Sequence, residues 1–248
     1  MTHNALIDSL VQDFSYLSQP FGLLIANDNI EEPLFYSELE EAILEVDGDA
    51  DIQFGISKFV IIPSTTDYVI KIPFNGRYEY YDDDIRLYEE EKLDDYTYII
   101  HDGCPYFYSP FSYVADYCEK EFSTYKKLCC KNLEYFVAET RFYKEFPNKI
   151  KIFTQEKIIP CFNDCEDRKP TIRSKDIAKR WIKEDCFALD STWLANCIDY
   201  YGEQQTKRFM DYCDNKEPDI LADTHLGNLG YRPDDGSPVI LDYSGFSD

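Results

Sequence analysis

Three oxygen-bearing side chains late in the sequence have types and spacing that could bind a divalent cation. Asp223 and Asn228 lie five residues apart, and Asp242 follows the apolar run Val239-Ile240-Leu241. Carboxylate and amide oxygens are hard ligands that suit Mg²⁺, which proteins bind through one or two carboxylates together with substrate phosphates. The pattern therefore predicts a magnesium site that handles phosphate. The alternative is ordinary turn chemistry, because Asp, Asn and Gly are common turn residues.

A β-hairpin is predicted to deliver the second carboxylate of this group. Its arms are Leu229 to Tyr231 and Val239 to Leu241, and Pro233-Asp234-Asp235-Gly236 supplies turn residues between them. Asp242 would then follow the second arm directly.

The segment Asp-x-His-x-Gly-Asn, followed by an apolar strand that ends in Asp, resembles the catalytic loop and metal-binding strand of the protein-kinase-like superfamily. The form with His two residues after the Asp is that of the aminoglycoside-phosphotransferase-like branch and of small kinase-like proteins encoded by phages. The resemblance implies that Asp223 is the catalytic base, that Asn228 binds Mg²⁺ and that Asp242 is the Asp of the DFG motif, written here Asp242-Tyr243-Ser244-Gly245. His225 stands where protein kinases have a Lys that contacts the transferred phosphate. We expect it to be a neutral donor or, preferentially, a structural cap of the loop.

The same resemblance implies an ATP site earlier in the chain. Gly55-Ile56-Ser57-Lys58 would be the phosphate-covering loop, with Gly55 and Ser57 as its binding residues, and Lys71 would be the strand-three Lys. A lone Lys within the apolar strand Tyr68 to Ile72 needs an anionic partner, which nucleotide phosphate supplies. The alternative for Lys71 is an edge-strand Lys that faces water.

Two further parts of the ATP site follow from the resemblance. Glu121 interrupts the inner stripe of a helix predicted over Tyr113 to Lys131, as the helix-C Glu that pairs with Lys71 would do; Glu119 is the second choice, and a boundary Glu is the alternative. Glu156 and Ile158 align with the hinge that binds adenine through backbone groups. ATP and Mg²⁺ are therefore the expected cofactors.

The periodicity of the chain predicts an α+β fold. The resemblance makes it a two-lobe kinase-like fold with an antiparallel-sheet N-lobe, a helix C, and a truncated, mainly helical C-lobe that ends just after the DFG-like strand. Residues 1–50 form an acidic helical extension, residues 51–158 form the N-lobe with an insertion at 75–111, and residues 159–248 form the short C-lobe with the catalytic loop. The predicted strands are Phe59 to Ile62, Tyr68 to Ile72, Phe136 to Tyr143 and Ile150 to Ile158, with a candidate at Tyr96 to Ile100. The predicted C-lobe helices are Ser174 to Asp185, a segment from Trp193 to Tyr201, and Glu203 to Cys213.

Composition narrows the set of partners and the compartment. The net charge is −23 and the pI about 4.4, which argues against direct nucleic-acid binding and against anionic membrane surfaces. We expect neither a transmembrane span nor a signal peptide. None of the nine Cys residues lies in a Cys-x-x-Cys pair, so we expect reduced thiols and a cytoplasmic protein, in the host cytoplasm if a phage encodes it.

The predicted function is an ATP- and Mg²⁺-dependent phosphotransferase acting on protein Ser or Thr, with a small-molecule hydroxyl as the next possibility. The alternative is a catalytically weak or inactive kinase-like protein that inhibits or sequesters a basic partner. Its contact surfaces would be residues 1–57, which contain twelve Asp or Glu and no Lys or Arg, and the insertion at 75–111.

Overall fold

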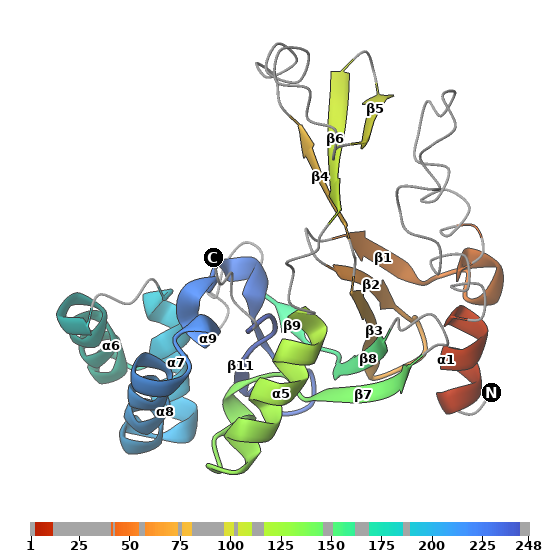
Figure 1. The fold of residues 1–248 in the computed structure, drawn as a ribbon. Coiled ribbons are helices and arrows are strands. Elements are labelled where there is room, and N and C mark those ends of the chain that lie inside the picture. The colour runs from red at the N-terminus through yellow and green to blue at the C-terminus, as the bar shows by residue number, and fades with distance from the viewer. Residues whose placement is uncertain are drawn as a thin grey trace, which may run out of the picture. The chain divides into compact units, whose positions relative to one another are not determined.

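The computed structural model describes residues 3–11, 41, 43–54, 58–73, 76–80, 97–101, 104–110, 117–145, 151–161, 169–185 and 189–243. The chain forms two compact units. Unit 1 comprises Met1–Cys118 and Phe142–Thr154, and unit 2 comprises Glu119–Arg141 and Gln155–Asp248. The fold is mixed α+β with antiparallel strand pairing and several helices, which confirms the predicted fold class at that level (Figure 1).

The main element of unit 1 is a five-stranded sheet in the order β1-β2-β3-β8-β7. The strands are β1 (Asp51–Phe54), β2 (Lys58–Ile62), β3 (Tyr68–Pro73), β7 (Thr140–Glu145) and β8 (Lys151–Glu156). The β2–β3 hairpin is antiparallel, with Val60 opposite Lys71. Asp47 fixes its turn, because its carboxylate accepts hydrogen bonds from the Ser64 backbone N–H at 2.8 Å and from the Ser64 hydroxyl at 2.6 Å. The predicted strands Phe59 to Ile62 and Tyr68 to Ile72 are confirmed as β2 and β3.

The core of unit 1 lies on one face of this sheet. Ile61, Ile70 and Ile72 of the hairpin are buried together with Ile152 of β8. Helix α1 (His3–Val11) adds Ile7 and Leu10 to the same cluster, and a helical segment at residues 43–46 adds Ile43. Two helical segments of the predicted extension at residues 1–50 thus pack on the sheet. Residues 1–2, 12–40 and 42 of that extension lie outside the described residues.

A separate three-stranded sheet occupies part of the insertion. Its order is β4-β6-β5, with β4 (Gly76–Tyr80), β5 (Thr97–His101) and β6 (Cys104–Pro110), and both pairings are antiparallel. The candidate strand at Tyr96 to Ile100 is confirmed as β5.

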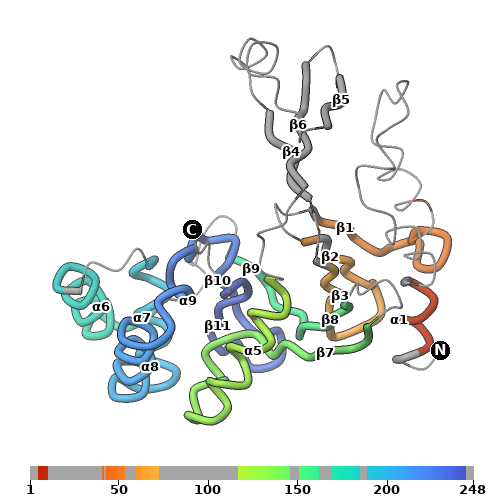
Figure 2. The backbone as a smooth tube through the Cα atoms, viewed as in Figure 1, coloured from red at the N-terminus to blue at the C-terminus, as the bar shows by residue number. Residues whose placement is uncertain are grey.

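Unit 2 combines helices with a small sheet. The helices are α5 (Tyr117–Cys129), α6 (Ile172–Asp185), α7 (Ser191–Tyr201), α8 (Glu203–Lys216) and α9 (Asp219–Ala222), and the 3₁₀ turns are η2 (Glu134–Phe136) and η4 (Leu226–Asn228). The sheet has the order β11-β10-β9, with β9 (Ile159–Pro160), β10 (Leu229–Tyr231) and β11 (Pro238–Ile240). These three strands are grouped in the backbone trace (Figure 2).

The core of unit 2 forms where α7 packs against both α6 and α8. Trp193 of α7 and Phe209 of α8 are almost fully buried, and the Phe209 ring stacks on Phe136 with 4.3 Å between ring centroids. Asp190 caps α7 by accepting hydrogen bonds from the backbone N–H groups of Thr192 and Trp193, which anchors the start of the helix.

Several boundaries differ from the sequence-based expectation. The strand predicted from Phe136 begins only at Thr140, because Glu134–Phe136 is a 3₁₀ turn and the Ala138 N–H donates to the carbonyl of Ile240 at 2.8 Å. The second hairpin arm is Pro238–Ile240 rather than Val239 to Leu241.

Other global features concern thiols, membranes and surface charge. Six cysteines are free thiols: Cys118, Cys129, Cys130, Cys161, Cys197 and Cys213. No helix among the described residues is long and apolar enough to cross a membrane.

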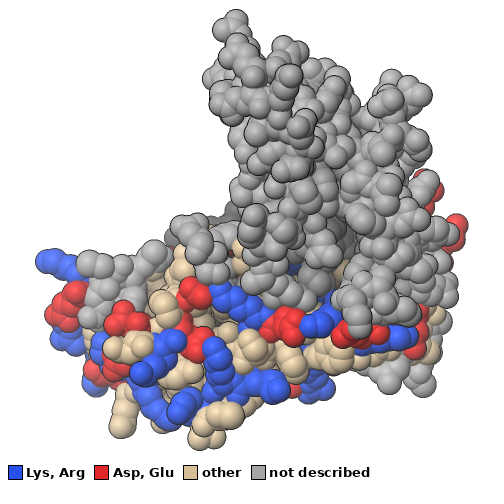
Figure 3. Space-filling view, viewed as in Figure 1, with Lys and Arg blue, Asp and Glu red and all other residues tan. Residues whose placement is uncertain are grey.

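Lys and Arg side chains gather on the face of unit 2 that carries α5 and α8 (Figure 3). Many of them pair locally, as in Lys120–Asp219, Lys127–Glu217 and Lys207–Asp211.

Candidate functional site

The loop between α9 and β10 cross-links two of the predicted site residues. Asp223 ends α9, and Asn228 closes η4 just before β10 begins. The Asn228 side-chain NH₂ donates to the Asp223 backbone carbonyl at 2.7 Å and to its carboxylate Oδ2 at 3.2 Å. These bonds fix the orientation of the Asn228 amide, and its Oδ1 is left as the oxygen that could bind a cation.

His225 serves as the structural cap of this loop. Its Nδ1 accepts a hydrogen bond from the Gly227 backbone N–H at 3.0 Å, which satisfies a donor at the start of η4. Its Nε2 lies 3.9 Å from Oδ1 of Asp223, and the side chain is 63% exposed. Two roles were expected for His225, a neutral donor and a structural cap of the loop. The described contacts support the structural cap.

The β10–β11 hairpin brings Asp242 to the same end as Asn228. Leu229 stands opposite Ile240 in the antiparallel register, and the Leu241 N–H donates to the Asn228 carbonyl at 2.8 Å. The pairing thus extends one residue beyond the strands, and Asp242 is the next residue. The three residues singled out by type and spacing therefore share one hydrogen-bonded frame.

Gly230 allows a third strand to approach this hairpin closely. A Cβ atom at this position would lie 2.6 Å from Cγ2 of Ile158 and from the carbonyl oxygen of Ile159, and 2.9 Å from Cδ1 of Leu241. Contacts below 3.0 Å are not tolerated without movement. The Cys161 N–H, just after β9, extends the pairing of β9 with β10 by donating to the Leu229 carbonyl at 2.8 Å.

The turn end of the hairpin is held by an ion pair, between Arg232 and Glu156, that was not predicted from the sequence. Arg232 makes two hydrogen bonds to the Glu156 carboxylate, at 2.7 and 2.9 Å, and donates to the carbonyls of Tyr135 and Val137. Glu156 also accepts from the Glu139 backbone N–H at 2.8 Å. Arg232 follows a strand directly, but its partners lie up to 97 residues away in sequence, so spacing could not reveal them.

The predicted hinge residues thus have clear structural contacts. The backbone N–H of Glu156 donates to the Glu139 carbonyl, and its carboxylate binds Arg232. Ile158 is buried in a small apolar cluster with Ala138 and Val239.

The two predicted charged partners are both buried. Lys71 is 5% exposed in β3, an interior strand between β2 and β8 of unit 1, so the alternative of a water-facing edge Lys is wrong. Glu121 is fully buried in α5, in the part of that helix that belongs to unit 2. The predicted phosphate-loop residues Gly55 and Ser57 lie outside the described residues, and Lys58 is the first residue of β2.

Tyr243 follows Asp242 and is almost fully buried. Its hydroxyl lies 2.7 Å from Oγ1 of Thr140 and 2.9 Å from the carbonyl oxygen of Ala138. Burial, and after it the nearby Glu121 carboxylate, raises the pKa of the Tyr243 hydroxyl well above its usual range. The hydroxyl therefore keeps its proton at any physiological pH.

The donor set of the loop is suited to a hard divalent cation. Asn228 would contribute an amide oxygen and Asp242 a carboxylate, and phosphate and water would complete the shell, as is typical of Mg²⁺. No group of three or more His, Cys, Asp or Glu side chains in the described ranges could hold a metal by itself.

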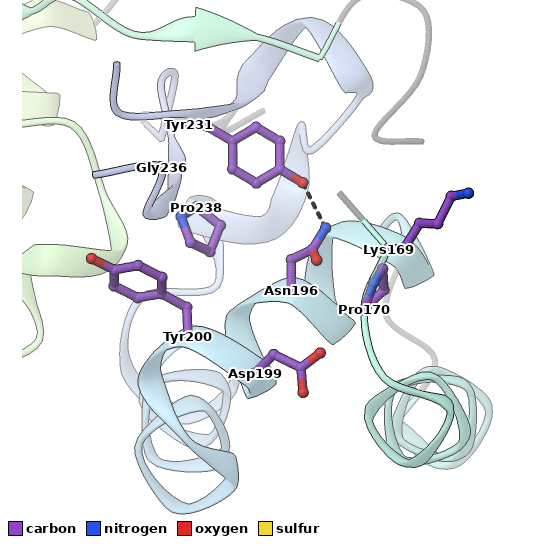
Figure 4. A pocket seen from close by; sticks show the side chains of 8 residues that line it. All are labelled: Lys169, Pro170, Asn196, Asp199, Tyr200, Tyr231, Gly236 and Pro238. Atoms are coloured by element: carbon purple, nitrogen blue, oxygen red, sulfur yellow. Dashed lines mark hydrogen bonds between the residues drawn. The ribbon is translucent and has the colours of Figure 1, made fainter. Parts of the chain in front are cut away.

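A concavity of about 290 Å³ lies at the turn end of the hairpin (Figure 4). Two polar side chains that line it hydrogen-bond within the protein: Asn196 donates to the Tyr231 hydroxyl at 2.8 Å, and the Tyr200 hydroxyl donates to Asp235 at 2.8 Å. Asp199 accepts from the Thr171 backbone N–H and hydroxyl. This arrangement joins α7 to the hairpin and to the start of α6, and we interpret it as structural.

Comparison with known proteins adds no relatives: no protein-family profile matches the chain, and a search of curated proteins found no match. We therefore infer function from the loop that holds Asp223 and Asn228 and from the hairpin that leads to Asp242.

Proposed function

We propose that this chain is an ATP- and Mg²⁺-dependent phosphotransferase with a two-lobe kinase-like fold. The observation that carries the proposal is the frame in which Asn228 is hydrogen-bonded to Asp223 while its strand neighbour Leu241 leads directly to Asp242. A turn without a catalytic role needs no such coupling of a carboxylate, an amide and a second carboxylate. The acceptor we propose is a Ser or Thr hydroxyl of a protein, with a small-molecule hydroxyl as the second choice.

Each residue of the frame has a separate role in this proposal. Asp223 would accept or orient the proton of the attacking hydroxyl, and the bond from Asn228 to its Oδ2 directs that carboxylate. Asn228 and Asp242 would hold Mg²⁺, which when bound offsets negative charge on the phosphates. Transfer then depends on positioning and electrostatics more than on covalent chemistry.

The buried charges support a nucleotide site. A buried Lys or Glu is costly unless it is paired or hydrogen-bonded, and Lys71 and Glu121 are both retained in buried positions. We propose that Lys71 holds the α- and β-phosphates and that Glu121 orients it, with Gly55 and Ser57 covering the phosphates. Glu156 and Ile158 would contribute to the adenine site through backbone groups.

The first prediction concerns nucleotide binding and transfer. At MgATP a hundred times its dissociation constant, the free energy of unfolding should rise by about 2.7 kcal/mol. Asp223→Ala should keep this stabilisation but lose transfer, because the change removes the base and leaves the metal ligands. Asp242→Asn should lose the part of the stabilisation that depends on Mg²⁺. Thermal unfolding and transfer from labelled ATP measure both effects.

Asp234→Ala is the matched control for these variants, because Asp234 is exposed in the hairpin turn. It should behave like wild type in both assays. The proposal fails if the wild-type protein shows no MgATP-dependent stabilisation. A phosphoproteomic comparison of cells that express wild type or Asp223→Ala would then identify the acceptor.

A second candidate function is supported by charge alone. The net charge of −23 would speed encounter with a basic partner and allow a sequestering role on a kinase-like scaffold. This candidate gives no reason for the hydrogen bonds that join Asp223, Asn228 and the residue before Asp242, and we therefore place it second.

A further inference from the structure

The residues on both sides of Asp242 are held by one buried polar network. The Gln155 side-chain NH₂ donates to the Leu241 carbonyl at 2.9 Å and to Oγ1 of Thr140 at 3.0 Å. The Tyr243 hydroxyl donates to the same Thr140 oxygen at 2.7 Å. Leu241 precedes Asp242 and Tyr243 follows it, so the network fixes the backbone before and after the carboxylate. We call these three side chains the Thr140–Gln155–Tyr243 network.

The three side chains of the network are buried, and their donors and acceptors match. Thr140 is fully buried, Tyr243 is 1% exposed and Gln155 is 3% exposed. Oγ1 of Thr140 accepts from both neighbours, and its own hydroxyl lies 3.4 Å from the Ala138 carbonyl oxygen. The Thr140 oxygen therefore accepts two hydrogen bonds, and the donors of Gln155 and Tyr243 that meet it do not compete with its own proton. Such networks specify one arrangement, because a shift of any member would leave a buried polar group without a partner.

Filling space does not require these residue types. Phe at position 243 and Leu or Met at position 155 would occupy similar volumes without burying polar atoms, which is costly unless every atom is paired. The amide and hydroxyl add direction, and they apply it to the two residues that flank Asp242. The Gln155 amide applies this direction through its contacts with Leu241 and Thr140.

We propose that Gln155 and Tyr243 are positioning residues that set the direction of the Asp242 carboxylate and thereby the affinity of the site for a divalent cation. This inference rests on the proposed function, since it concerns the cation that Asp242 would hold with Asn228. Neither residue touches the reacting atoms. They keep residues 241–243 in one backbone conformation, which continues from the pairing of β10 with β11.

The test measures cation affinity separately from catalysis. Mn²⁺ is used as a paramagnetic probe, and its free concentration is followed by electron paramagnetic resonance with a non-hydrolysable ATP analogue present. Tyr243→Phe removes only the hydroxyl, and Gln155→Met removes only the amide. Each should weaken Mn²⁺ binding about tenfold, the usual scale for residues that orient a metal ligand. The apparent KM for Mg²⁺ in transfer should rise by a similar factor.

Two controls separate positioning from folding. Tyr200→Phe removes a tyrosine hydroxyl from the turn end of the hairpin and should leave Mn²⁺ binding unchanged. Thr140→Ser keeps the shared oxygen and should bind Mn²⁺ as wild type does, whereas Thr140→Val removes the oxygen and should bind about tenfold more weakly. This pair keeps the inference testable if Tyr243→Phe fails to fold.

The possible results distinguish this inference from the proposed function. If wild type binds Mn²⁺ with the nucleotide and Tyr243→Phe, Gln155→Met and Thr140→Val all bind it equally well, the positioning inference is wrong and the proposed function stands. If wild type binds no Mn²⁺ with the nucleotide, both are wrong. Weaker binding in Thr140→Val and in the two single-group variants, with Thr140→Ser and Tyr200→Phe unchanged, supports both.

Discussion

Gly230 is the position at which the hairpin depends most directly on the absence of a side chain. We predict that Gly230→Ala destabilises the protein by about 1 to 3 kcal/mol, because its Cβ would meet the Ile159 carbonyl at 2.6 Å and the strands must separate to admit it. Chemical denaturation measures this loss. The effect should also reach the site, because Asn228 directly precedes β10.

Gly48→Ala is the matched control, since the nearest atom to its added Cβ would be the Leu44 carbonyl oxygen at 3.7 Å, an ordinary contact. This variant should be neutral or more stable by up to about 1 kcal/mol. Equal stability of the two variants would show that β9 does not approach Gly230 as closely as described.

Arg232 provides the second residue-scale prediction. Its pairing with Glu156 is mostly buried, with side-chain exposures of 21% and 25%, so removing one partner leaves a charge without compensation. Arg232→Met should therefore cost about 3 kcal/mol in the free energy of unfolding. The loss should change little with ionic strength, because buried pairs are weakly screened.

The comparison for Arg232 is Arg173, which pairs with Glu203 while 82% exposed. Arg173→Met should cost less than about 1 kcal/mol. If the two losses measured by urea denaturation are equal, the Arg232 pair contributes no more than a surface ion pair.

Residue types and spacing could predict the site only in part. The Asp223, Asn228 and Asp242 pattern was visible because its members lie within twenty residues. Tyr243 was visible only as part of the Asp-Tyr-Ser-Gly motif, and its contacts to Ala138 and Thr140 cross more than one hundred residues. No periodicity encodes such a contact. It depends on the folding of unit 2, which brings Ala138 and Thr140 to Tyr243.

At the scale of elements, Asp199 of α7 holds the start of α6. It accepts from the Thr171 N–H at 2.7 Å, from the Thr171 hydroxyl at 2.9 Å and from the Ser174 hydroxyl. Burial alone would raise the pKa of the Asp199 carboxyl, but these hydrogen bonds outweigh it and lower that pKa. The ionised carboxylate is thus the form that stabilises the packing of α6 on α7.

We predict a pH-dependent loss of stability for Asp199→Asn. Because the folded pKa lies below the ordinary value of 3.8, the carboxylate contributes stability above pH 3.8, and this contribution is lost as the pH falls through the folded pKa. The variant should melt below wild type at pH 7, and the difference should shrink in strong acid. Melting curves from pH 2 to pH 7 test this. A difference that is constant across the range would contradict it, and Asp214→Asn, on the exposed side of α8, is the control.

Helices were easier to predict than strands. The stripe around Ile177 and Trp181 gave α6 to within a few residues, and α8 began at the expected Glu203. In the insertion, the one candidate strand named from the sequence was Tyr96 to Ile100, which is β5. Strands β4 and β6 were missed because their pairing is non-local, with residues 76–80 opposite residues 106–110.

At the scale of the whole molecule, charge is unevenly divided between the two units. Unit 1 contains 25 of the 48 acidic residues and 8 of the 25 basic residues, a net charge of −17. Unit 2 contains 23 acidic and 17 basic residues, a net charge of −6, and carries the loop of Asp223 and Asn228. A negative field repels free ATP, and the residues proposed to meet phosphate or its cation lie in both units, Lys71 in unit 1 and Asn228 and Asp242 in unit 2.

This division allows the two candidate functions to be tested against each other. Residues 82–95 contain eight acidic and two basic residues in unit 1. If the protein works by sequestering a basic partner, replacing each Asp by Asn and each Glu by Gln in this segment should weaken partner binding and abolish the cellular effect. Asp242→Asn should then be harmless, because one charge in the loop contributes little to a long-range field.

If the protein is a phosphotransferase, the same two variants should behave in the opposite way. The neutralised segment should retain transfer from labelled ATP, since none of the residues proposed to bind nucleotide or metal lies within 82–95. Asp242→Asn should lose transfer, because a neutral amide is a far weaker ligand for Mg²⁺ than a carboxylate. A shortened variant that lacks residues 82–95 separates the effect of length from that of charge. A cellular effect that survives Asp242→Asn and disappears with the neutralised segment would overturn the phosphotransferase proposal.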